Sequence, residues 1–102
     1  MSGIANPYRY QYETVAVSQT GQVLGGTGAT GDYVHRLIIN TITVLTAGVT
    51  LIDGSSSIVI QTAASAVIGV QSIEINTASL TGAWKITTGA GATVVAVGIF
   101  SA

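Results

Sequence analysis

Residues 24–32 read Leu-Gly-Gly-Thr-Gly-Ala-Thr-Gly-Asp, with four glycines in seven positions. The spacing G-x-G-x-x-G occurs at Gly26, Gly28 and Gly31, and in nucleotide-binding proteins it precedes a helix whose N-terminus holds a pyrophosphate. Here residues 33–45 follow, and they are rich in β-branched side chains, which favour a strand. We therefore predict no nucleotide site. The glycines are expected to let the chain turn into a sheet and to act as a hinge that aims the segment before them.

The rest of the chain alternates between short β-like runs and turns rich in glycine. The expected strands are 14–18, 22–24, 33–45, 49–53, 58–62, 67–76, 83–87 and 93–100. They recur every ~8–12 residues, and no window has a helical period, which is typical of an antiparallel β-sandwich or barrel. Asp53-Gly54 is a strong signal for a tight turn between two of them.

Two of these strands, 33–45 and 93–100, are apolar on both faces. Side chains alternate between the two faces of a strand, so such a strand is buried on both sides. Burial is expected either inside the domain or against another subunit.

Composition indicates one domain of unusually low charge. Of the 102 residues 48% are hydrophobic and only 7% charged, against about 25% charged in an average soluble domain. Such a surface repels its neighbours weakly, which suits a subunit that stays assembled. The strong cations are Arg9, Arg36 and Lys85, too few and too scattered for nucleic acid or an anionic membrane. No cysteine is present, so disulfides and thiolate metal sites are excluded.

Neither a secretory signal nor a membrane helix is predicted. The N-terminus has no basic region followed by an apolar core. The longest apolar runs, such as 92–100, are far shorter than the ~20 residues that a membrane helix needs.

Residues 1–13 are predicted to be an N-terminal arm and residues 14–102 the β-sandwich domain. Within the arm the tyrosines alternate with polar residues, so in an extended chain they share one face. They could pack on the domain's own core as an edge strand, or lie on a partner, since tyrosine is enriched at interfaces. Arg9 could clamp a carboxylate of that partner. The candidate partner-binding residues are Tyr8, Arg9, Tyr10 and Tyr12.

No catalytic, cofactor-binding or metal-binding residue is predicted. His35 is the sole histidine, and Asp32, three positions away, would point to the opposite face of a strand. Asp53 in its turn offers a single charged ligand where a Ca²⁺ site has several. Trp84 is interpreted as an anchor of a core or interface and not as a sugar platform.

Three blocks, at residues 23–37, 49–54 and 82–91, carry a family resemblance. The last reads Gly-Ala-Trp-Lys-Ile-Thr-Thr-Gly-Ala-Gly. In this order the blocks resemble the small decoration, or cement, proteins of tailed-bacteriophage heads. The resemblance spans roughly residues 20 to 102 and leaves out the arm.

The resemblance implies a jelly-roll-like β-sandwich that forms a homotrimer on the outer capsid surface of a virion after synthesis in the host cytoplasm. There it would bridge neighbouring major capsid proteins and stiffen the shell. It implies no catalysis, no cofactor and no small-molecule substrate. Two alternatives stay open: a carbohydrate-binding β-sandwich module of a virion or cell-surface protein, and a small hydrolase.

Overall fold

The computed structural model describes residues 10–43, 48–62 and 67–102. Tyr8 and Arg9 therefore lie outside the described residues. The described part contains strands and turns and no helix. The strands are β1 (Gln11–Val15), β2 (Gln22–Val23), β3 (Tyr33–Thr41), β4 (Val49–Asp53), β5 (Ser56–Gln61), β6 (Gly69–Ala78), β7 (Trp84–Thr87) and β8 (Ala92–Ile99).

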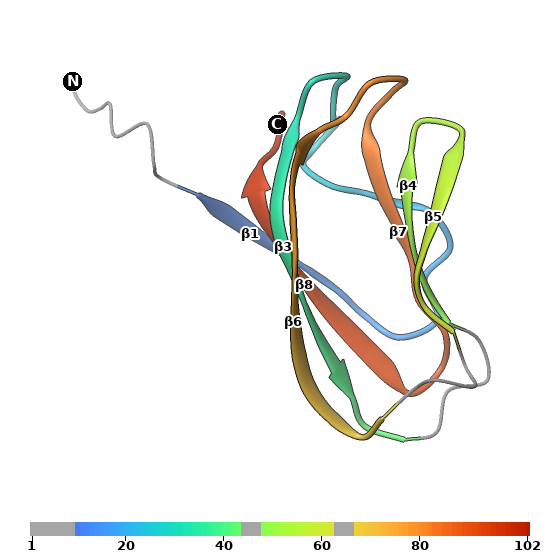
Figure 1. Ribbon diagram of the computed structural model, residues 1–102. Helices are drawn as coiled ribbons and strands as arrows, with labels where there is room; N and C mark the ends of the chain where they lie inside the picture. Colours follow the sequence, from blue (N-terminus) through green and yellow to red (C-terminus); the bar gives the residue numbers. More distant parts are fainter. Residues whose placement is uncertain (1–9, 44–47, 63–66) are drawn as a thin grey trace.

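The strands form two four-stranded sheets that face each other (Figure 1). Sheet A has the order β1-β8-β3-β6 and sheet B the order β2-β7-β4-β5, and every pair is antiparallel. Four of the hydrogen-bonded pairs join strands from opposite halves of the chain: β1 with β8, β2 with β7, β3 with β6, and β4 with β5. The chain therefore runs as one long hairpin that is folded into two layers. This is a jelly roll, and it confirms the predicted β-sandwich.

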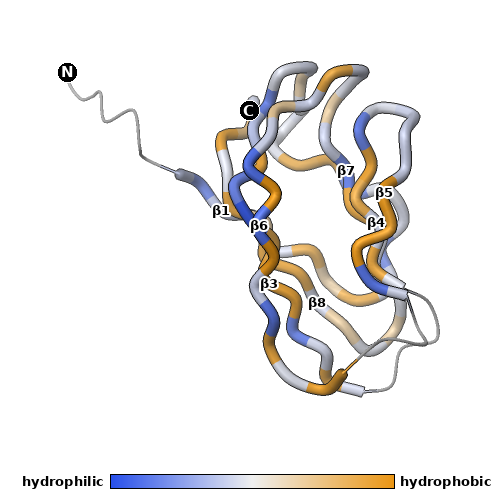
Figure 2. Tube along the Cα trace, in the orientation of Figure 1, coloured by the Kyte–Doolittle hydropathy of each residue, from blue (hydrophilic) through white to orange (hydrophobic). Residues whose placement is uncertain are grey.

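The core lies between the sheets. Buried and half-buried side chains alternate along β4, β7 and β8, as expected for strands with one inward face. Figure 2 shows apolar residues along the strands of both layers. The buried apolar side chains are Val15, Leu24, Val34, Leu37, Ile39, Val49, Leu51, Trp84, Ile86, Ala92, Val94, Ala96 and Phe100.

A β-bulge in β3 explains why this strand has no clean alternation. The register with both neighbouring strands shifts between Val34 and Arg36. Val34 and Leu37 are both buried, whereas His35 and Arg36 are only half buried. A bulge inserts one residue on one strand, so two successive side chains share the outer face.

The glycine segment is the loop between β2 and β3, and it leads directly into a strand. It packs against the C-terminus. The amide of Gly28 donates to the carbonyl of Ser101 at 3.2 Å, and the Asp32 carboxylate accepts from the amide and hydroxyl of Ser101 at 2.9 and 2.7 Å. Gly25 has a φ of 89°, and a Cβ there would collide with the backbone of Ser101. These glycines therefore serve close packing, which differs from the expected hinge that aims the arm. Residues 11–13 of the expected arm belong to β1, which is paired with β8, and β2 lies between β1 and the glycines.

The two long edges of the sandwich differ. At one edge β1 of sheet A lies beside the segment that contains β2, and the carboxylate of Glu13 accepts from the amide of Gly25 and from Nε2 of Gln22, both at 2.8 Å. At the other edge the outermost strands are β5 and β6, and they do not pair with each other. We call this second edge the open edge.

Candidate functional site

The most extensive candidate surface is the side of sheet A that faces away from sheet B. We call it the outer face. Inward side chains of β8, such as Val94 and Ala96, are buried, and the residues between them point outward. The aromatic, aliphatic and charged members of the outer face are Tyr10, Tyr12, Tyr33, His35, Arg36, Ile38, Val70, Glu74, Val95, Val97 and Ile99; between them lie the polar Thr14, Asn40, Ser72 and Thr93.

One row across the outer face changes from apolar to charged. One row of paired positions runs Tyr12, Val97, Arg36, Glu74, from β1 to β6. Tyr12 is 74% exposed, and Val97 is half buried although no described element covers it. Along this row the apolar side chains, on β1 and β8, lie beside the charged pair on β3 and β6.

Aromatic rings gather where β1 begins. The ring of Tyr10 lies 4.7 Å from that of His35 and 6.1 Å from that of Tyr33, between centroids. The hydroxyl of Tyr33 donates to Oδ1 of Asn76 at 3.0 Å, which holds this ring against the sheet. Aromatic side chains fixed in this way lose little freedom when a partner covers them.

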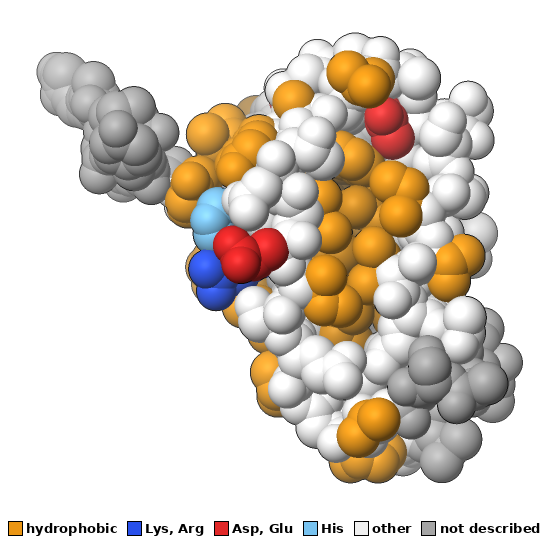
Figure 3. Space-filling view, in the orientation of Figure 1, with side chains coloured by type: hydrophobic (Ala, Val, Ile, Leu, Met, Phe, Trp, Pro, Cys, Tyr) orange, Lys and Arg blue, Asp and Glu red, His pale blue; other side chains and the backbone are white. Residues whose placement is uncertain are grey.

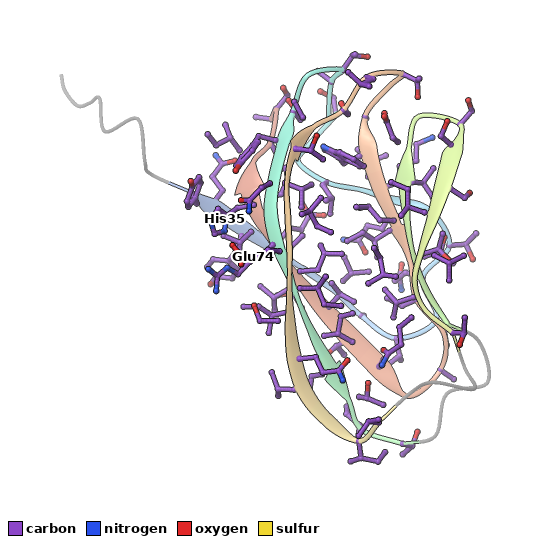
Figure 4. All side chains as sticks on the ribbon, in the orientation of Figure 1. His35 and Glu74 are labelled. Atoms are coloured by element: carbon purple, nitrogen blue, oxygen red, sulfur yellow. The ribbon has the colours of Figure 1, made fainter. Side chains whose placement is uncertain are left out.

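His35 belongs to this aromatic group. Its Nδ1 accepts a bond from Nε of Arg36 at 3.2 Å, which requires an Nδ1 without a proton. Figure 4 shows His35 and Glu74 on the side of sheet A that faces away from sheet B. No hydrogen bond joins His35 to a carboxylate among the described residues, and Asp32 is occupied with Ser101 at the end of the sandwich.

The structure therefore brings two of the predicted partner-binding residues together on one face. Tyr10 and Tyr12 both lie outward, Tyr10 on the aromatic group and Tyr12 beside Val97. They do not pack on the core, although β1 is an edge strand. The prediction for Tyr8 and Arg9 falls on residues outside the described part.

Other members of the outer face were not predicted as site residues. Ile38, Val95 and Val97 carry its aliphatic part. The signal for them was present, because their strands are apolar on both faces. No described part of the domain covers this side, so within residues 10–43, 48–62 and 67–102 the outward apolar side chains of these strands are not buried by the domain itself.

Asp53 holds a turn. Its carboxylate accepts from the amide of Leu80 at 2.9 Å and from the amide of Thr81 at 3.0 Å. These backbone hydrogen bonds, that from Leu80 first, lower the pKa of the Asp53 carboxyl from its usual 3.8. The oxygens thus fasten the loop that leads to β7. Within residues 10–43, 48–62 and 67–102 no group of three or more His, Asp or Glu side chains could hold a metal ion.

Trp84 is 1% exposed and packs in the core, as expected for an anchor. No pocket is found in the described structure. No helix long and apolar enough to cross a membrane occurs in the described part of the chain.

Comparison with protein-family models, with curated proteins and with solved structures found no match for this chain.

Proposed function

We propose that this chain is a structural virion subunit that decorates the outer surface of a phage capsid. It bridges neighbouring major capsid proteins as a homotrimer and has no catalytic role. The observation that carries the proposal is the outer face of sheet A, which no described residue covers and which includes Tyr10 and Tyr12 of the expected N-terminal arm.

The family resemblance of the three sequence blocks is the reason for proposing a phage capsid as the partner of this surface. In the folded chain the blocks meet. A Cβ on Gly28 would touch Ala83, a Cβ on Gly82 would touch Gly54, and Trp84 bonds to the Asp32 carbonyl. The blocks thus maintain one end of the sandwich. They support a shared fold, whereas contact with the shell depends on the outer face.

The mechanism is adhesion. Apolar area removed from water contributes about 25 cal/mol per Å², from which the cost of association is subtracted. Three linked copies bind one symmetric site, so avidity multiplies a modest contact. Tyr10 and Tyr12 are the aromatic anchors, and Arg36 and Glu74 fix orientation at the border.

The test is co-sedimentation of the full chain with capsids built from the major capsid protein of the same virion. Tyr12→Ser is expected to lower the bound fraction at least about tenfold, the effect of losing one interface anchor. The matched control is Leu80→Ser, because Leu80 is 83% exposed and lies on the loop after β6, away from the outer face. Failure of the wild type to bind, or equal losses in both variants, would refute the proposal.

The carbohydrate alternative has a separate outcome. A panel of immobilised glycans is probed with the wild type and with Tyr12→Ser. Retention on glycans that is lost in the variant, without binding to capsids, would assign the aromatic group to sugar recognition instead.

A further inference from the structure

Strand β5 has a free edge that is regular over residues 56–59; beyond them its register with β4 shifts between Val49 and Thr50, which leaves Ile60 as the extra residue of a bulge. It is the outermost strand of sheet B, and its residues 56–61 read Ser-Ser-Ile-Val-Ile-Gln, without charge or proline. Proteins usually protect exposed edges with charges, proline, bulges or very short strands, because unpaired amides and carbonyls recruit other strands. Ile58 and Val59 are 44% and 61% exposed.

The other three edge strands are protected. Strand β2 has only two residues. Strand β1 carries Glu13, whose carboxylate is bound to the segment that follows β2. Strand β6 carries the exposed Glu74 and a positive φ of 52° at Asn76, where its backbone departs from regular β geometry. Among the described strands, only β5 combines a regular exposed stretch, residues 56–59, with a neutral sequence.

An apolar seam lies beside β5. Ile60 on β5 and Ile73 and Ile75 on β6 are only partly buried, although they pack on the core. Figure 3 shows apolar side chains between the two edge strands, with mostly polar and backbone atoms on either side. The open edge therefore offers unpaired backbone groups next to uncovered apolar surface.

We propose that β5 pairs antiparallel with β5 of a second copy of this chain, about a two-fold axis. In such a contact each residue faces the same short segment of its partner. A charge in that segment would be opposed by its own copy, which destabilises a strand pair. β5 has no charge, whereas the same arrangement at β6 would bring Glu74 towards Glu74 of the second copy. The neutral sequence of β5 thus permits pairing with a second copy, whereas the same contact at β6 opposes like charges.

The pairing joins the B sheets of two copies into one continuous sheet. It brings Ile58 of each copy over the seam, since Ile58 lies opposite the buried Leu51 of β4 and faces inward. The outer face of sheet A stays free. The inference does not rest on the proposed function, because it concerns the opposite layer of the sandwich and needs no capsid.

The experiment compares molecular masses by sedimentation equilibrium over a range of concentrations. Val59 points outward from β5, opposite the half-buried Thr50, so Val59→Lys keeps the core intact while placing like charges across the axis. The wild type is expected to reach twice the mass of Val59→Lys, whatever assembly the variant forms. Val59→Glu should behave as Val59→Lys does, and a mixture of the two variants should recover the wild-type mass, because opposite charges now meet.

Three results would overturn the pairing: equal masses of wild type and variants, a mass ratio of three, or a mixture that does not reassociate. Circular dichroism of each variant confirms that it is folded. Leu80→Lys is the control for added charge on an exposed apolar residue, and its mass should equal that of the wild type.

Because the chain has no cysteine, Val59→Cys supplies a second readout. Its oxidation should form a covalent dimer faster than that of Leu80→Cys, and equal rates count against the pairing.

Discussion

The indole Nε1 of Trp84 donates a hydrogen bond of 2.7 Å to the main-chain carbonyl of Asp32, which joins the start of β7 to the end of the glycine segment. The same carbonyl accepts from the amide of Ser79 at 2.9 Å. One carbonyl thus links the loop before β3 to the loop after β6 and to the largest buried side chain.

Replacing Trp84 by Phe should destabilise the fold by about 1–3 kcal/mol, because a hydrogen bond is lost and a smaller ring leaves space. The cost stays moderate because Ser79 still satisfies the carbonyl. Urea unfolding followed by circular dichroism measures the change. A variant as stable as the wild type would show that this bond does not contribute.

Gly28→Ala should be more destabilising than Gly31→Ala. Both glycines have positive φ, 67° and 96°, which costs an alanine about 1–2 kcal/mol. A Cβ on Gly28 would also meet Ala83 and Val23, which adds about 1–3 kcal/mol of overpacking, whereas one on Gly31 meets nothing within 4 Å. The two free energies of unfolding test this order, and equal values would contradict it.

The strands were predictable because their signal is local. β4 has the bounds expected from the sequence, and the strand expected over 33–45 was found but ends at Thr41. The order of the strands within each sheet was not predictable in this way, because β1 pairs with β8 from the other end of the chain. No local pattern encodes such a pairing, and the jelly roll came from the resemblance.

The outer face was only partly predictable. Alternation placed Tyr10 and Tyr12 on one side of an extended segment, and doubly apolar strands indicated a second buried face. Their neighbours across the sheet depend on register. The bulge that turns His35 and Arg36 to the same side has no signature in the sequence. Likewise, the packing of Gly25 on Ser101 joins residues far apart in the chain.

Asp53→Asn should destabilise the protein most at neutral pH. The pKa of Asp53 is lower in the folded state, so the ionised carboxylate stabilises the fold above its usual pKa, and this contribution is lost as the pH falls through the lower folded value. The stability difference between wild type and Asp53→Asn should therefore narrow below about pH 4. Urea unfolding at a series of pH values measures it, and a difference that stays constant down to pH 2 would argue against the role of the Leu80 and Thr81 amides.

Glu13→Gln should loosen the edge at which β1 lies beside β2. The carboxylate accepts from the amide of Gly25 and from Nε2 of Gln22, both at 2.8 Å. Glutamine has the same shape, but one terminal atom becomes a donor that faces a donor. Because bonds to charged acceptors are the stronger ones, we expect a loss of about 1–3 kcal/mol in the free energy of unfolding. The amide of Gly25 should also exchange its hydrogen faster.

Glu74→Gln on the outer face is the matched control, with an expected change within about 0.5 kcal/mol. Equal losses in the two variants would mean that the carboxylate of Glu13 is not what joins the two layers at this edge.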